Sequence, residues 1–455
     1  MKRLTISCLC LAFHALVHAV PGKSFRFKDL NKHTDVLTKS EKHLRIFNRI
    51  NSADFPSLNS AVNIAGSAAA ALIIDRKQIL KADLIIPANI TLIVKDGGCI
   101  DNAGHTIIIN GTIVANPGPI FLGEGFVSGL SKASPEWWQR NKVPGVTDMK
   151  LAIQSAVNSL SQKGGEVVFR KTIYYIKGIN SRRLDGVQIK SNITFRGVGF
   201  GTEIRQSVDC YNLFFTQYGK PITDPNQSIQ VKNVKFYGIR FTQPVTPAQW
   251  ASEKHLLNFG SITGLTVKNC YFTGFCSDAM QLGFNLSDDL RVVYPAIVRN
   301  IVISQNVFDG INKNNRNAIS IICGQSITIS HNKFKNTTRN DMPGAIDIEP
   351  EGSWPVISDV SIEDNSFENI GGHGAVLLIF TAVLKKAPSN IKVTGNTFNG
   401  ITAPYYYRLI GPPDEPKLSS YSPENIVFKG NTHIKGSKML TLEGAKKSYE
   451  SKRSD

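Results

Sequence analysis

The chain has 455 residues, with 52 Lys and Arg against 35 Asp and Glu, which gives a formal net charge of +17 at pH 7. Beyond the N-terminal segment no stretch approaches 18 uninterrupted apolar residues, so we expect no transmembrane segment. A basic protein is attracted to polyanions. The sequence has no helix-turn-helix, zinc or RNA-binding motif, which argues against nucleic acid as the partner. Nothing in it indicates an oligomeric state.

Residues 1–19 have the features of a secretory signal peptide. Lys2 and Arg3 precede an apolar stretch that ends at Val17, and Val17-His18-Ala19 fits a small-residue cleavage site. We therefore expect cleavage near Ala19 and a secreted or periplasmic protein.

Residues 20–130 are predicted to contain a small N-terminal β unit. A polar, basic lead occupies residues 20–50. The apolar stretches LIIPANITLIVKDGG, HTIIINGTIVA and PIFLG then follow, separated by Gly, Asn and Pro. Short apolar runs between such residues are typical of β-strands joined by turns.

One helix is predicted at about residues 147–162. Thr147 is the candidate N-cap, and Gly164-Gly165 ends the helix. Its apolar face comprises Leu151, Ile153, Ala156, Val157 and Leu160. We expect this helix to cap the first coil of the domain that follows, because the open end of a solenoid exposes unpaired strand edges.

A repeated segment dominates residues 131–435. Its copies are VKNCYF (267–272), ISQNVF (303–308), ISHNKF (329–334), IEDNSF (362–367), VTGNTF (393–398) and FKGNTH (428–433). Alternating strand residues that recur at such a period indicate a solenoid. We predict an all-β, right-handed parallel β-helix of at least seven coils. Phe308, Phe334, Phe367 and Phe398 should stack inside it, and the Asn two residues before each Phe should form a structural ladder. Residues 436–455 are predicted to be a basic C-terminal tail.

A second strand precedes each repeat: DAMQLG (278–283), NAISII (317–322), GAIDIE (344–349) and GAVLLI (374–379). Aligning their Ala residues predicts that Met280, Ile319, Ile346 and Val376 point inward. The same alignment places Gln281, Ser320, Asp347 and Leu377 in one outward column. Polar groups of successive coils therefore converge on Asp347.

GAIDIEPEG is the densest acidic part of the chain. Asp347 and Glu349 share one face of a strand, roughly 6.6 Å apart along it, and Glu351 follows in the turn. Such a separation suits the acid and base of an inverting glycosidase, ~6.5–9.5 Å apart. Asp347, Glu349 and Glu351 would alternatively suit a Ca²⁺ site, or form a solvated acidic turn. No cofactor other than this candidate Ca²⁺ is indicated.

Basic and polar residues are expected beside these acids. Asp278 begins the strand two coils earlier, with Gln281 on its outer face, and Arg316 and Asn317 lie in the coil between. Arg316 could pair with Asp278, hold a sugar carboxylate or act as the base of a β-elimination. We predict substrate-binding roles for Asp278, Gln281 and Asn317, and also for Glu351 of the acidic turn.

Several segments resemble the secreted pectate-lyase superfamily, which includes rhamnogalacturonase-like and epimerase-like members. They are Pro135-Glu136-Trp137-Trp138, GVTDMKLAIQSAV, GGEVVF and NITFRGVGFGTEI (192–204). The resemblance covers roughly residues 130–435 and implies a β-helix that acts on polysaccharides. This chain has PGVTDM where such proteins usually have DGVTDD. The fold carries hydrolases, lyases, epimerases and phage tailspikes, so the resemblance leaves the reaction open.

Two further residues are candidates for substrate binding. Gly372-His373-Gly374 resembles the Gly-His-Gly element of polygalacturonases, whose Asn-Thr-Asp and Asp-Asp motifs are absent in the expected order. Trp354 follows the acidic turn, where an exposed aromatic ring could stack on a sugar. A turn histidine and a loop-shielding tryptophan are the alternative interpretations.

The sequence thus favours an enzyme that cleaves an acidic, uronate-containing polysaccharide in an outer groove of the β-helix. Asp347, Glu349 and Arg316 are the catalytic candidates, and hydrolysis and β-elimination both remain open. The alternative is a non-catalytic carbohydrate-binding or surface-adhesion solenoid. That alternative would be favoured if every acid of the groove were paired with Lys or Arg.

Overall fold

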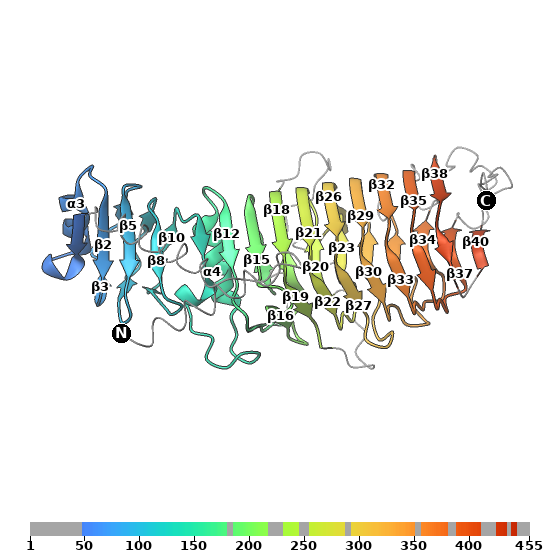
Figure 1. The fold of residues 1–455 in the computed structure, drawn as a ribbon, viewed down its shortest axis with the longest axis horizontal. Helices are drawn as coiled ribbons and strands as arrows, with labels where there is room; N and C mark the ends of the chain where they lie inside the picture. The colour runs from blue at the N-terminus through green and yellow to red at the C-terminus, as the bar shows by residue number, and fades with distance from the viewer. Residues whose placement is uncertain are drawn as a thin grey trace, which may run out of the picture.

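The structure is a computed structural model, which describes residues 48–179, 185–216, 231–244, 254–286, 293–350, 356–380, 388–410, 425–434 and 438–443. Strands follow one another along a single long axis, with the N-terminal strands at one end and the C-terminal strands at the other (Figure 1). The predicted signal peptide lies outside the described residues. Within them, no helix combines the length and apolarity needed to cross a membrane.

Three long parallel sheets form most of the molecule. The first sheet has ten strands: β11 (Lys132–Ala133), β12 (Gly165–Val168), β15 (Ile193–Arg196), β18 (Val231–Tyr237), β21 (Ile262–Lys268), β26 (Val298–Ser304), β29 (Gly324–Ser330), β32 (Ile357–Glu363), β35 (Ser389–Thr394) and β38 (Ile426–Lys429). The second sheet has nine: β13 (Ile173–Ile176), β16 (Glu203–Gln206), β19 (Arg240–Thr242), β22 (Tyr271–Thr273), β27 (Val307–Asp309), β30 (Lys333–Lys335), β33 (Ser366–Glu368), β36 (Thr397–Asn399) and β39 (Thr432–His433). The third sheet also has nine: β14 (Val187–Gln188), β17 (Asn212–Phe215), β20 (His255–Phe259), β23 (Met280–Leu282), β28 (Ile319–Ile321), β31 (Ile346–Ile348), β34 (Ala375–Phe380), β37 (Tyr405–Ile410) and β40 (Lys438–Glu443).

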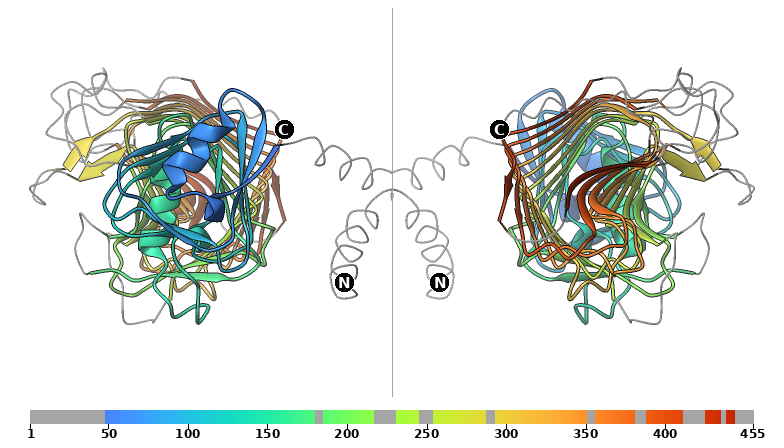
Figure 2. Two further views of the ribbon diagram at one scale, coloured as in Figure 1. Left: turned by 90° about the vertical axis from the view of Figure 1, so that its left-hand side faces the viewer. Right: turned by 90° about the vertical axis from the view of Figure 1, so that its right-hand side faces the viewer.

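The chain visits the three sheets in the same order in every coil. From β12 to β40 each coil contributes one strand to the first, second and third sheet in turn, and each strand pairs in parallel with its equivalent in the next coil. Seen along the axis, the strands of successive coils lie over one another (Figure 2). The fold is therefore the predicted right-handed parallel β-helix, and its nine-stranded second and third sheets agree with the expectation of at least seven coils. Within the described ranges, the only antiparallel pair is the hairpin of β24 (Phe284–Leu286) and β25 (Val293–Pro295).

The predicted Phe column is confirmed. Phe308, Phe334, Phe367 and Phe398 are fully buried, and neighbouring ring centroids in this column lie 4.7 to 4.9 Å apart with the rings almost parallel. A strand spacing of ~4.8 Å fixes this repeat. The column continues to Phe272 at one end and ends on the ring of His433 at the other.

The Asn ladder is structural, as expected. Asn306 donates from its backbone N and its Nδ2 to Oδ1 of Asn332, at 2.9 and 3.0 Å. Asn332 does the same to Asn365, and Asn365 to Asn396. Each amide also donates to a carbonyl, for example Asn332 Nδ2 to Ile303 O at 2.8 Å. The ladder thus satisfies buried backbone groups at the corner between the first and second sheets.

The residue before each ladder Asn makes the corner. Gln305, His331 and Asp364 have φ values of +56°, +57° and +53°, and Gly395 has +67°. This left-handed conformation turns the chain from one sheet to the next. Gly adopts the left-handed conformation without steric cost, and polar residues such as Asp tolerate it. The residue type in front of each ladder Asn can therefore vary.

The predicted N-terminal β unit is a shorter stack of parallel strands. Its first sheet has four strands: β1 (Asn48–Asn51), β2 (Ala70–Ile74), β5 (Ile90–Val94) and β8 (Ile113–Ala115). The other two sheets have three each: β4 (Leu84–Ile86), β7 (Ile107–Ile109) and β10 (Val127–Ser128); β3 (Lys77–Ile79), β6 (Cys99–Asp101) and β9 (Phe121–Leu122). Helix α3 (Leu58–Ala65), preceded by η2 (Ser52–Asp54), lies across the N-terminal end of this stack (Figure 2).

The predicted helix near residues 147–162 is α4 (Lys150–Leu160). Ile153, Val157 and Leu160 are buried as expected, but Leu151 is 70% exposed and does not belong to the apolar face. Strands of both stacks, β10 on one side and β11 and β12 on the other, contact α4, as does the short helix η3 (Pro135–Trp137). The helix therefore lies at a junction rather than on a free end of the solenoid, which the sequence alone did not predict.

The C-terminal boundary of the β-helix also differs from the prediction. Strand β40 lies inside residues 436–455, which the sequence assigns to a basic tail, and pairs with β37 through Leu440 and Leu442. Its few apolar residues are flanked by charged ones, which hides the strand in the sequence. The remaining tail lies outside the described residues.

Candidate functional site

The site is built on the third sheet. Gln281 pairs with Ser320, and Ser320 with Asp347, so these residues form the outward column that the sequence predicts. In the next coil the predicted alignment is wrong by one residue: Leu378, not Leu377, pairs with Asp347. The run from Ala375 to Ile379 is apolar at every position, so its inward and outward residues cannot be told apart by alternation.

The column is not open to solvent as an outer groove. Asp347 and Ser320 are 0% and 1% exposed, and Gln281 is 7% exposed. Glu349, just after β31, is half-buried. The expectation of a solvent-exposed Asp347 is therefore wrong, and Glu349 is the member of the acidic pair that reaches the surface.

Asp347 and Glu349 form a close carboxyl pair. Asp347 is completely buried and Glu349 is half-buried, and their carboxyl groups interact electrostatically. Burial raises the pKa of Asp347 well above its usual value, and the negative charge of Glu349 raises it further. Burial also raises the pKa of Glu349, although Arg316 opposes this. Ionising both of two neighbouring buried carboxyls is costly, so this arrangement favours retention of a proton by one of them.

Asn317 supports this pair from the preceding coil. Its Nδ2 donates to Asp347 Oδ2 and to Ser320 Oγ, both at 3.1 Å. Asp347 Oδ1 is buried and has no hydrogen-bond partner among the described residues. Gln281 Oε1 and Asn317 Oδ1 are likewise buried acceptors without a described donor.

Asp278 and Arg316 form a separate ion pair. Arg316 Nη1 donates to both carboxylate oxygens of Asp278 at 2.8 Å, and the backbone N of Asn317 donates to Asp278 Oδ1 at 3.3 Å. Asp278 raises the pKa of Arg316, so the guanidinium remains charged. His255 Nδ1 lies 3.9 Å from Asp278 Oδ2, and burial lowers the pKa of His255 to about 4. This histidine is therefore neutral at neutral pH.

The remaining candidates are dispersed or cannot be placed. Glu351 and Trp354 lie outside the described residues. His373 is exposed and lines a different groove, over turns that lead into the third sheet. The structure therefore brings together Asp278, Gln281, Arg316, Asn317, Asp347 and Glu349, and separates His373 from them.

A Ca²⁺ site is not formed by the described residues alone. No group of three His, Cys, Asp or Glu side chains suited to a metal ion occurs among them. A calcium site that includes Glu351 stays a prediction.

His255 is a site residue that sequence reasoning missed. His255 lies on β20 and is buried beside Asp278 and Ser277. The strand alignment could have found it, because His255 stands at the start of a third-sheet strand, at the position that Asp278 and Asn317 occupy in later coils. The segment HLLNF lacks the Ala residue on which the other strands were aligned, so the sequence indicates this position only weakly.

No protein-family model and no curated protein sequence matches the chain. Its fold is similar to several solved structures. An iota-carrageenase complexed to iota-carrageenan fragments is 13% identical, with a TM-score of 0.45 over 64% of this chain and 61% of that one. The iota-carrageenase from A. fortis is 13% identical, with a TM-score of 0.42 over 62% and 59%. The endo-xylogalacturonan hydrolase from Aspergillus tubingensis is 14% identical, with a TM-score of 0.45 over 70% and 78%.

The chain spans about three fifths of the length of the two carrageenases. Similarities at this level do not transfer a function. What the protein does is therefore inferred from its own residues.

Proposed function

We propose that this protein is a polysaccharide-active enzyme that hydrolyses an acidic, uronate-containing glycan at the Asp347–Glu349 pair. The observation that carries the proposal is the placement of two neighbouring carboxyls, with Asp347 fully buried and Glu349 half-buried, where burial raises both pKa values. Carboxylic acids with raised pKa values are the usual proton donors of glycoside hydrolysis. The proposal extends to secretion, which the N-terminal signal sequence predicts.

The proton balance of hydrolysis suits such a pair. Glu349, the more exposed member, gives the shared proton to the glycosidic oxygen as the bond from that oxygen to the anomeric carbon breaks. Water adds to the anomeric carbon, and its proton returns to the pair. Asp347 holds the proton and the charge between these steps, as in other carboxyl pairs that share one proton.

Elimination is less well supported than hydrolysis. A β-eliminating lyase needs a base, and Arg316 is the candidate that the sequence offers. The guanidinium is held on both oxygens of Asp278, and that contact stabilises its charged form. We therefore assign Arg316 to positioning: its charge lies near Asp347 and Glu349 and limits the rise of their pKa values.

The non-catalytic alternative predicts that all acids of the site are paired with Lys or Arg. Asp278 meets that condition through Arg316. Among the ion pairs of the described residues, none involves Asp347 or Glu349. These two carboxyls can therefore take part in proton transfer, which a pure binding surface does not need. The buried acceptors Gln281 Oε1 and Asn317 Oδ1 could also receive substrate hydroxyl groups.

Incubation with a panel of acidic polysaccharides tests the proposal. Reducing ends and the absorbance of unsaturated uronates should be followed together. We expect new reducing ends without the absorbance, and we expect Glu349→Gln to abolish them. The appearance of both signals would identify elimination instead. The absence of both signals would favour the non-catalytic solenoid.

A further inference from the structure

A second polar groove lies away from the acid pair, on turns that lead into the third sheet. It has a volume of about 660 Å³, and its lining includes Asn312, Lys313, Arg339, Asn340, His373 and Thr402. These residues come from the turns before β28, β31, β34 and β37. Coils are spaced by ~4.8 Å, so four turns span roughly 14 Å. This turn groove is therefore suited to an extended chain rather than to a single small ion.

Lys313 reaches across the turn groove. Its Nζ donates to Thr402 Oγ1 at 2.6 Å, although Thr402 is 89 residues further along the chain and lies three coils away. Its stem passes over Gly371, where a Cβ atom would lie 3.0 Å from Lys313 Cδ. The side chain is therefore held in an extended position over the intervening turns, with the glycine leaving room for it.

The backbone that presents Lys313 is strained. Ile311, Asn312 and Lys313 are consecutive and have φ values of +43°, +58° and +64°. Left-handed residues other than Gly normally occur singly, and Ile is among the least tolerant of this conformation. The backbone N of Lys313 donates to Asn336 O at 3.0 Å, which helps to hold the turn. Strain that the fold maintains at one turn suggests that the position of this lysine matters.

The charge of Lys313 is not neutralised locally. Burial lowers the pKa of its ammonium group, with no contribution from a nearby acid. Arg339, the other strong base of the groove, differs because its Nε lies 3.1 Å from Asp341 Oδ1. Within the described ranges, the one polar contact found for the Lys313 ammonium is the Thr402 hydroxyl. An anionic ligand would supply the missing counter-charge.

We propose that the turn groove binds the carboxylate or sulfate group of an acidic glycan, with Lys313 as the cation that meets it. This binding proposal rests on the proposed function, because the glycan that binds here is the one proposed to be cleaved at the acid pair. Asn312 and Asn340 supply amides suited to sugar hydroxyls. The turn that carries Lys313 continues into Asn317, which holds Asp347, so one chain could contact both places.

Nucleic acid fits the turn groove less well. A sequence-independent strand needs a row of cations along its backbone and aromatic rings for stacking. The described lining offers Lys313 and a paired Arg339, with no Phe, Tyr or Trp. A single unpaired ammonium among amides matches a polymer whose charges are spaced by sugar rings.

The test is a calorimetric titration of the full chain with three oligosaccharides of equal length: an oligogalacturonate, a sulfated oligosaccharide and a neutral methyl-esterified oligogalacturonate. A Glu349→Gln background prevents turnover. Lys313→Met keeps the stem and removes the charge, and we expect it to weaken binding of the preferred acidic ligand by about tenfold or more, the scale of a charged hydrogen bond. Lys392→Met removes the same charge from an exposed position on β35 and should leave binding unchanged.

Comparison of the two acidic ligands identifies the anionic group. If Lys313→Met fails to fold, Lys313→Gln replaces it, since its amide can still donate to Thr402. Equal binding by the Lys313 variant, equal binding of the neutral ligand, or no binding of either acidic ligand would each overturn the proposal. If binding depends on Lys313 but the wild-type protein cleaves no glycan, the binding proposal for the turn groove stands and the proposed hydrolysis is rejected. If the wild-type protein cleaves a glycan but the Lys313 variant binds as well as its background, the hydrolysis stands and the binding proposal is rejected.

Discussion

At the scale of single residues, the candidate site centres on the neighbouring carboxyls of Asp347 and Glu349. The alternation of the strand places Asp347 and Glu349 on one face, and in the structure Asp347 is fully buried and Glu349 half-buried. Burial raises both pKa values, so the folded protein holds a proton that the unfolded chain would release. The retained proton would serve as a catalytic acid. When the pH is high enough to remove it, the buried carboxylate lowers the stability of the folded state.

Asp347→Asn should separate these two effects. Asn preserves the shape and can accept from Asn317 while donating to Glu349, so we expect a folded protein. Turnover on a cleaved glycan should fall by a factor of ~10² or more, the usual scale for a lost acid or base. Initial rates on the substrate identified by the panel measure this. Full activity of the variant would make the acid pair part of the scaffold.

The pH dependence of stability provides a second readout of Asp347→Asn. A carboxyl with a raised pKa stabilises the fold at low pH, and that contribution is lost as the pH rises from the usual carboxyl range through the raised value. We therefore expect the variant to gain stability relative to the wild type as the pH increases, by about 1.4 kcal/mol for each unit of pKa shift removed. Urea unfolding at several pH values measures it.

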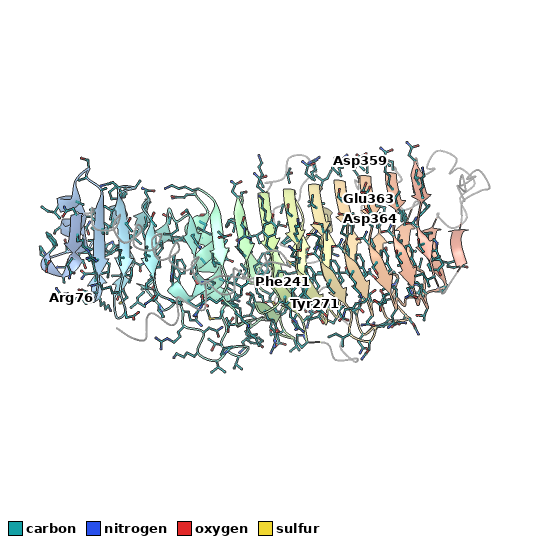
Figure 3. The ribbon with its side chains drawn as sticks, viewed as in Figure 1. Arg76, Phe241, Tyr271, Asp359, Glu363 and Asp364 are labelled. Carbon is teal, nitrogen blue, oxygen red and sulfur yellow. The ribbon has the colours of Figure 1, made fainter. Side chains whose placement is uncertain are left out.

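Asp359→Asn is the matched control for both measurements. Asp359 is exposed on β32 of the first sheet, whereas the acid pair belongs to the third sheet, and Figure 3 labels Asp359. It accepts from Asn390 Nδ2 at 3.0 Å, and its φ of +58° also suits Asn. Activity and pH dependence should match the wild type. A comparable loss of turnover in this control would point to a general effect of charge.

At the scale of elements, stacking of identical rungs stabilises the β-helix. Phe241 and Tyr271 illustrate the two faces of the second sheet (Figure 3): Phe241 is fully buried and stacks on Phe272 at 5.0 Å, whereas the Tyr271 hydroxyl donates to Asp309 at 2.7 Å. Inward positions repeat the same ring in successive coils, and each coil contacts only its neighbours. Loss of one ring should therefore weaken two interfaces.

Phe334→Ala tests the column. Phe334 stacks on Phe308 and Phe367 with centroids 4.8 and 4.7 Å away and is fully buried. We expect a destabilisation of about 3–5 kcal/mol, the range for a buried aromatic truncated to Ala. Val302→Ala, at a 40% exposed position on the outer face of β26, should cost much less. Chemical denaturation measures both, and equal small losses would mean that the column contributes little.

At the scale of the whole molecule, two stacks of parallel strands meet at α4. The helix fills the space between β10 and β12, and Val157 is completely buried there. Figure 1 shows the N-terminal strands continuing the axis of the longer β-helix, so the junction is internal. A polar group at this position would disturb the packing of both stacks.

Val157→Asp should lower the melting temperature and promote aggregation, because it buries an unpaired charge and loosens the interface that covers the strand edges. Leu151→Asp is the control on the same helix: Leu151 is 70% exposed, so its replacement should be tolerated. Thermal unfolding followed by light scattering compares the two. Equal behaviour of both variants would show that α4 does not protect the junction.

The sequence by itself determined the β-helix, its Phe column and its Asn ladder, because these features repeat and each repeat is a local pattern of alternating residues. It also identified Asp278, Arg316, Asn317, Asp347 and Glu349 as neighbours, since register follows from aligned strands. The shift at β34, the internal position of α4 and the strand at Lys438–Glu443 were missed where alternation is absent or masked by charge. Only the tertiary structure decided the burial of Asp347, the raised pKa that follows from it and the reach of Lys313 to Thr402. Burial and side-chain convergence depend on how distant coils pack, and no local pattern encodes them.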